Sequence, residues 1–254
     1  MPIFSESTVR EFCTLTGDDN SIHDPGWMRQ QGKRPIVPGM LTFLYAAQLA
    51  KEHWADGKTS ASVYFGDLLH ADEGVTFRSL PDGLEVRLSA EVEGKDILAA
   101  DGRYTQLVRG KKGLPVGGHR SQNMDINRAV IDRFAPLIGT SPEEAAFFYA
   151  VACMSQVLLQ SARAPQGSGE GAPQRPAGPM PLYHSIHLDF PDGIRHMREG
   201  TLYFCTRPPQ EEAGLRGKRY ARLSVSCDHD GQVLYAAQAC VKLVDPRVLM
   251  RALR

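Results

Sequence analysis

The sequence predicts an α+β fold in which two long buried helices are each wrapped by a curved antiparallel sheet. Residues 40–54 and 141–163 are apolar on most sides, which is typical of helices that lie inside a protein. Each is followed by segments in which apolar and polar residues alternate, the pattern of strands with one buried face. The order of a buried helix followed by strands therefore occurs twice in the 254 residues.

The first half begins with a short helix, predicted from about Ser7 to Leu15 and ended by Gly17. An ordered polar loop with one helical turn is expected over residues 18–35, which contain two prolines and two glycines. The long helix follows, and Pro38 at its start suits a first helical turn. Strands are predicted in the alternating segments 75–80, 83–94 and 97–110.

The second half repeats this order. A helix is predicted over residues 125–139, before the second long helix. Residues 164–181 are rich in proline, glycine and serine and are expected to form a flexible excursion. Strands are predicted at 183–190, 200–207, 220–229 and 232–244.

Two strand pairs indicate a divergent duplication. Residues 87–108 and 222–244 both begin with Arg-Leu-Ser, make a tight turn and end in Leu-Val. We therefore expect two units, 1–122 and 123–254. Their sheets are expected to join edge to edge, which also hides edges that would otherwise aggregate.

Charge and composition exclude several classes of protein. Lys+Arg and Asp+Glu both number 29, and this balance argues against nucleic acid as a partner. No apolar run approaches the roughly 18 residues of a membrane span, and no secretory signal is visible at the N-terminus. Five scattered cysteines without a CxxC fit reduced thiols rather than disulfides or a zinc site. We expect a cytoplasmic protein with no metal, no membrane and no nucleic-acid partner.

One stretch of the polar loop concentrates groups that can do chemistry. The run TGDDNSIHDP, residues 16–25, holds Asp18, Asn20 and His23. Asp and Asn are also ordinary turn and cap residues, and a lone loop histidine is often only hydrogen-bonded. A carboxylate and an imidazole this close can nevertheless act together as general acid and base. Gly39, at the start of the long helix, either permits tight packing or offers a backbone N–H at the helix's positive end.

The segments FCTLTGDDNSIHDP and, after a loop, RPIVPGMLTFLYAAQLA resemble the MaoC-like (R)-specific enoyl thioester hydratases, also called hydratase 2. The resemblance covers about residues 12–48 and implies a hot-dog fold, here a double hot-dog. Carried over position by position, the family's catalytic aspartate and histidine fall on Asp18 and His23. The intervening asparagine falls on Asn20, and the glycine whose N–H contacts the substrate carbonyl falls on Gly39.

Two positions depart from the hydratase 2 pattern. The family's proline after asparagine is Ser21 here, and its histidine before Gly-Met-Leu is Pro38. Dehydratases of fatty-acid synthesis have proline at that second place, but they need an upstream histidine and an acid within the helix. The acid's position is Leu44 in this chain.

The resemblance implies a lyase that hydrates trans-2-enoyl thioesters, or dehydrates 3-hydroxyacyl thioesters, without a cofactor. Coenzyme A or an acyl carrier protein would carry the acyl group. One alternative is a hot-dog thioesterase, although such enzymes usually place their acid on the central helix, where the first acid here is Glu52. The other alternative is a non-catalytic acyl-binding partner subunit.

The second half has no Asp-x4-His loop before its long helix. Residues 133–144 occupy the equivalent place. We therefore expect one active site per chain, with the second half completing the sheet and shaping the acyl pocket. Because a double unit mimics the dimer of single hot-dog chains, we expect a monomer or a homodimer.

Overall fold

The computed structural model describes residues 2–49, 51, 59–82, 85–92, 95–104, 120–162, 180–192, 197–213 and 219–253. The strands are β1 (Thr59–Phe65), β2 (Thr76–Asp82), β3 (Glu85–Val92), β4 (Lys95–Tyr104), β5 (Arg120–Ile126), β6 (Met180–Phe190), β7 (Gly200–Thr206), β8 (Gln210–Ala213), β9 (Arg219–His229) and β10 (Gln232–Val244). The helices are α1 (Glu6–Thr16), the 3-10 turn η1 (Ser21–His23), α2 (Pro25–Gln30), α3 (Gly39–Leu49), α4 (Arg128–Ile138), α5 (Pro142–Ala152), α6 (Met154–Ala162) and α7 (Pro246–Ala252).

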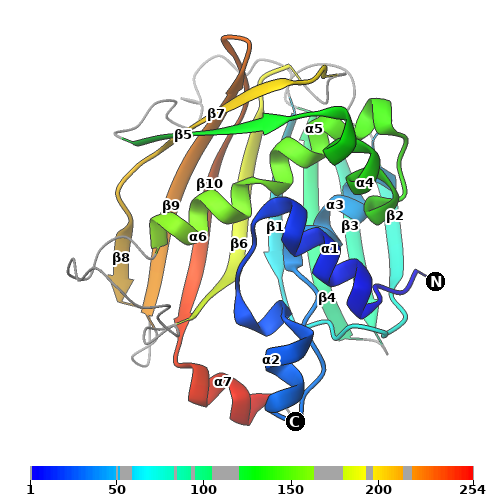
Figure 1. Ribbon diagram of the computed structural model, residues 1–254, viewed down its shortest axis with the longest axis vertical. Coiled ribbons are helices and arrows are strands. Elements are labelled where there is room, and N and C mark those ends of the chain that lie inside the picture. Colours follow the sequence, from blue (N-terminus) through cyan, green and yellow to red (C-terminus); the bar gives the residue numbers. More distant parts are fainter. Residues whose placement is uncertain are drawn as a thin grey trace.

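The strands form one antiparallel sheet of two equivalent halves, and Figure 1 shows α5 and α6 crossing it. The order is β2-β3-β4-β1-β6-β10-β9-β7-β5, with β8 paired to β9. Strands β1 and β6 pair where the two halves meet, and we call this pair the seam. Counted outward from the seam, the strands of the first half (β4, β3, β2) correspond in order to those of the second half (β10, β9, β7). The repeated Arg-Leu-Ser triplets lie on the matching strands β3 and β9. The predicted edge-to-edge union is thus confirmed, with β1 and β6 paired from Thr59↔Phe190 to Tyr64↔Ser185.

The long helices are buried because nearly every face meets apolar partners. In α3 seven residues are buried, and in α5 the whole run 145–152 is buried. Removing this apolar surface from water is the main stabilising term of the fold. The second helix is not continuous, because a turn at Cys153 separates α5 from α6. The predicted first helix is also present as α1, ended by Gly17 in the left-handed conformation (φ 67°).

Several elements differ from the prediction. Strands β1, β5 and β8 and helix α7 are additional to those expected from the sequence. Residues 180 and 181, expected to end the flexible excursion, are the first residues of β6. The rest of that excursion and residues 52–54 of the first long helix lie outside the described residues. The boundary between units at residue 122 stays a prediction.

A second, smaller apolar cluster lies apart from the main core. It joins the polar loop to α7, which stands beside α2 at the end of the strands (Figure 1). The Asp245 side chain caps α7 by accepting from Arg247 N, and Pro246 opens the helix. No helix in the described part of the chain is both long and apolar enough to cross a bilayer. The buried members of this cluster are Ile22, Met28, Ile36, Met180, Leu249 and Leu253.

Candidate active site

The loop between α1 and α2 brings the predicted polar groups into the protein interior. Gly17 turns the chain out of α1, and a Cβ at this position would lie 2.5 Å from Gln156 Cδ. The end of α1 is fixed by Tyr149, whose hydroxyl donates to the Leu15 carbonyl at 2.8 Å. Beyond this point Asp18 is only 6% exposed and His23 only 8% exposed. Such burial needs partners for both groups.

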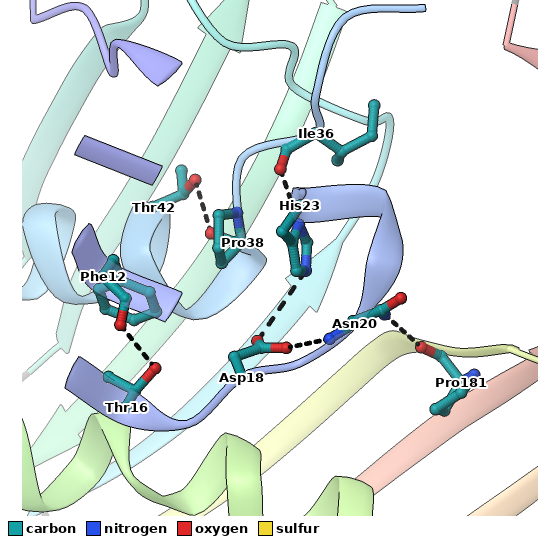
Figure 2. A network of polar contacts seen from close by, with 9 residues as sticks. All are labelled: Phe12, Thr16, Asp18, Asn20, His23, Ile36, Pro38, Thr42 and Pro181. Carbon is teal, nitrogen blue, oxygen red and sulfur yellow. Dashed lines mark hydrogen bonds and ion pairs between the residues drawn. The ribbon is translucent and has the colours of Figure 1, made fainter. Parts of the chain in front are cut away.

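His23 is held in one tautomer by the backbone. Its Nδ1 lies 2.7 Å from the Ile36 carbonyl oxygen (Figure 2). A carbonyl can only accept, so Nδ1 carries a proton, and in the neutral form of the ring Nε2 is the unprotonated nitrogen. Nε2 lies 3.9 Å from Asp18 Oδ2. This separation is too long for a direct hydrogen bond, but two hydrogen bonds of about 2.8 Å meeting at about 90° on one water oxygen would span it.

Asp18 and Asn20 are ordered by each other and by the second half of the chain. The Asn20 backbone N–H donates to Asp18 Oδ1 at 3.2 Å, which leaves Oδ2 directed toward His23 (Figure 2). The Asn20 side chain donates from Nδ2 to the Pro181 carbonyl of β6 at 3.3 Å. Asn20 therefore fastens the loop to the strand at the seam of the sheet.

Gly39 is the first residue of α3, where a backbone N–H has no intrahelical acceptor. The first helical hydrogen bond joins Thr42 N to the Pro38 carbonyl at 3.2 Å. A Cβ at position 39 would lie 2.8 Å from both Cδ1 and Cε1 of Phe65. Glycine is thus required by the close approach of this ring, and it leaves a donor at the positive end of the helix.

A cavity of about 680 Å³ brings all four predicted residues together, since Asp18, Asn20, His23 and Gly39 each line it. This volume lies within the range usual for small-molecule sites. Both halves of the chain build the walls. Apolar side chains at the lining include Val37, Phe65, Leu159, Tyr183, Leu249 and Leu253.

No family model and no curated protein matches the sequence. Solved structures do match. A MaoC-like dehydratase superposes with a TM-score of 0.56 and 10% identity, covering 96% of this chain and 95% of that one. The full-length peroxisomal multifunctional enzyme type 2 of Drosophila melanogaster gives 0.53 and 11%, over 95% of this chain and 47% of that one. The acyl-CoA thioesterase II TesB2 of Mycobacterium marinum gives 0.50 and 15%, over 82% and 89%.

The chain has the double hot-dog fold of the MaoC-like dehydratases. At these identities the likeness concerns the fold. Enzymes that bear the names dehydratase and thioesterase share this fold. The fold therefore does not decide which reaction this chain catalyses, and the residues of its own cavity must do so.

The loop has no counterpart among the described residues of the second half. In the second half α4 and α5 are joined directly by residues 139–141, which leaves no room for an equivalent of the loop that holds Asp18 and His23. Within the residues that the structure describes, no group of His, Cys, Asp and Glu is arranged to hold a metal ion.

The hot-dog cavity also has walls that the sequence did not indicate as functional. Leu249 of α7 and Leu253, which follows this helix, line one side, and Tyr183 of β6 lines another. The pair Asp245-Pro246, an N-cap followed by a helix-opening proline, is a signal that could have located α7. A single tyrosine near the start of a strand carries no comparable signal.

Proposed function

We propose that this protein is a hydro-lyase that adds water to trans-2-enoyl thioesters, giving (R)-3-hydroxyacyl thioesters, and catalyses the reverse dehydration. The observation that carries the proposal is the pairing of His23 Nε2 with Asp18 Oδ2 across 3.9 Å at a cavity wall, with His23 Nδ1 bonded to the Ile36 carbonyl. A separation of this size suits one water molecule that donates to both atoms.

His23 acts as the general base in this scheme. As the water oxygen attacks C3, one of its protons passes to His23 Nε2, and the pair returns a proton to C2. Such proton transfer typically contributes about 10²–10⁴-fold. The Ile36 carbonyl holds the Nδ1 proton throughout, and the nearby Asp18 carboxylate stabilises the imidazolium that forms.

Gly39 supplies the electrophilic side of the reaction. Attack at C3 moves negative charge onto the thioester oxygen. The Gly39 N–H, at the positive end of α3, would donate to this oxygen and stabilise the enolate-like transition state. The absence of a side chain at this position allows the thioester to approach the backbone.

The stereochemistry and the carrier are the finer parts of the proposal. Because Asp18 and His23 come from the same loop, water would reach C3 from one face and give a single enantiomer. The (R) configuration and the choice of coenzyme A or acyl carrier protein as carrier come from the resemblance to hydratase 2. A thioesterase acid on the central helix has no counterpart in α3, whose residues 39–49 include no Asp or Glu.

The decisive test is the mass and configuration of the product from trans-2-enoyl thioesters of several chain lengths. We expect the gain of one water and an (R)-3-hydroxyacyl product, with coenzyme A thioesters tried first and acyl carrier protein thioesters second. The variants Asp18→Asn and His23→Ala should each lose at least about 10²-fold in kcat.

Asp24→Asn is the matched control. Asp24 lies in the same loop but caps α2 by accepting from Gly26 N and Trp27 N, and it does not line the cavity. This variant should retain the wild-type rate. Release of free carrier from the wild type would identify a thioesterase instead. No product with either carrier would point to an acyl-binding partner subunit and contradict the proposal.

A further inference from the structure

A β-bulge in β6 decides where Tyr183 points. In the pairing of β6 with β10, Ser185 lies opposite Cys240 but Tyr183 lies opposite Val241, so His184 is an extra residue. In a regular strand Tyr183 would share the face of Ser185. The bulge instead places it on the face of Val241, which is 1% exposed in the main core. Bulges beside active sites often serve to re-aim a side chain.

The re-aimed ring is fixed at the cavity. Its centroid lies 5.8 Å from that of Phe65, which itself packs over Gly39. Both aromatic rings line the cavity with Asp18 and Gly39. Tyr183 therefore lines the same cavity as Asp18 and His23, and it comes from the other half of the chain.

The Tyr183 hydroxyl is buried and has no hydrogen-bond partner among the described residues. Burial raises the pKa of this phenol above its ordinary value, and the Asp18 carboxylate raises it further, while the Ser155 hydroxyl opposes the shift. The group is consequently a neutral O–H donor. Ser155 Oγ, also buried with no partner among the described residues, lies on the neighbouring helix α6. A buried donor left unpaired destabilises a fold, so its presence here calls for a ligand group.

We propose that the Tyr183 hydroxyl donates a hydrogen bond to the oxygen that adds to or leaves C3 of the acyl group. In hydration this oxygen belongs to the attacking water, and in dehydration it belongs to the 3-hydroxyl. This inference rests on the proposed function. A water that donates hydrogen bonds to His23 Nε2 and Asp18 Oδ2 directs one of its lone pairs at C3. Its second lone pair remains available to accept a hydrogen bond. Tyr183 is the donor for that remaining lone pair.

The same contact operates in the dehydration direction. The Asp18/His23 pair takes the proton from C2, and the electrons of that C–H bond form the C2=C3 double bond. When the C3–O bond breaks, its electron pair stays on the oxygen, and protonated His23 passes its proton to that oxygen to form water. The Tyr183 O–H stabilises the charge that grows there and transfers no proton itself. Tyr183 is thus a positioning residue for the reacting oxygen.

The test is Tyr183→Phe, which keeps the ring against Phe65 and removes only the hydroxyl. We expect kcat to fall about tenfold, the effect of one hydrogen bond to a group that gains charge. KM for the enoyl thioester should stay within about twofold, since the substrate has no oxygen at C3. Tm should be unchanged or higher, because the variant removes an unpaired buried group.

Tyr235→Phe is the matched control in the same half. Its hydroxyl donates to the Ala150 carbonyl at 2.9 Å, and it does not line the cavity. Its loss should lower Tm and leave kcat unchanged. If Tyr183→Phe showed this second pattern, its role would be structural and the inference would be overturned.

A binding measurement separates this inference from the proposed function. In Asp18→Asn, whose turnover should be slowed at least about 10²-fold, calorimetry compares an (R)-3-hydroxyacyl-CoA with the saturated acyl-CoA of equal length. We expect a several-fold preference for the hydroxylated ligand that disappears in Asp18→Asn/Tyr183→Phe. A preference that survives overturns the role of Tyr183 and leaves the proposed function standing, whereas failure of the wild type to hydrate enoyl thioesters overturns the proposed function and this inference with it.

Discussion

Replacing Gly39 by alanine tests the geometry of the proposed oxyanion donor. The new Cβ would lie 2.8 Å from two ring carbons of Phe65, whereas carbon atoms prefer separations of about 3.5–4.0 Å. The ring or the helix start must therefore move by about 0.7–1.2 Å. Tyr183 packs on the same ring and restrains it. Overpacking of this kind costs about 1–3 kcal/mol, offset by up to about 1 kcal/mol from the better helix propensity of alanine.

The expected result is a large loss of activity with a small loss of stability. A displacement near 1 Å at a reacting centre can cost about 10²-fold, so kcat/KM should fall by one to two powers of ten. Urea unfolding should show a loss of about 0–3 kcal/mol. Rates are followed through the absorbance of the conjugated enoyl thioester.

The double variant Gly39→Ala/Phe65→Leu provides the check on the cause. A smaller residue at position 65 makes room for the new methyl group, so part of the lost stability and rate should return. If Gly39→Ala kept more than half of the wild-type kcat/KM at equal stability, the close approach of Phe65 would not require glycine at position 39.

Three further outcomes are expected. Tyr149→Phe removes the donor to the Leu15 carbonyl and should cost about 1 kcal/mol in urea unfolding. An unchanged free energy of unfolding would show that this hydrogen bond does not hold the end of α1. Leu249→Ala should cost about 2–3 kcal/mol and raise KM, because it opens the α7 wall; an unchanged KM would exclude that wall from the site. Burial raises the pKa of the Cys153 thiol to about 12, so the reactive thiolate is scarce at mildly alkaline pH. Iodoacetamide should then modify this cysteine only after unfolding. Mass spectrometry that finds the modified cysteine in native protein would contradict this prediction.

The sequence suffices to predict those parts of the fold whose signals are local. Apolar runs reveal α3 and the α5–α6 region, because a helix buried on all sides needs apolar residues on all sides. Alternation reveals β9 and β10, although the consecutive buried residues 225–227 and 234–237 depart from a strict one-face pattern. Strand β1 is missed because TSASVYF begins with small polar residues, yet it lies between two neighbours at the seam, where backbone pairing can dominate over side-chain pattern.

The candidate site divides in the same way. Asp18, Asn20 and His23 are close in sequence, so a single loop brings them together and a local pattern can indicate them. The contribution of Tyr183 depends on a bulge in strand pairing and on the joining of two half-sheets. Neither feature can be predicted from the residues next to Tyr183 in the sequence. The tautomer of His23 likewise depends on the Ile36 carbonyl, whose position only the folded chain determines.

The seam between β1 and β6 has a consequence for how such a protein can change. In an assembly of two identical subunits, any substitution occurs twice and alters both copies of a site at once. Here the two half-sheets belong to one polypeptide, so each residue occurs once. Under the proposed function, the half that provides Pro181, Tyr183 and α7 is free to adapt to the neighbouring loop, because it has no second reaction centre of its own to preserve. Covalent linkage thereby converts a symmetric architecture into two specialised parts.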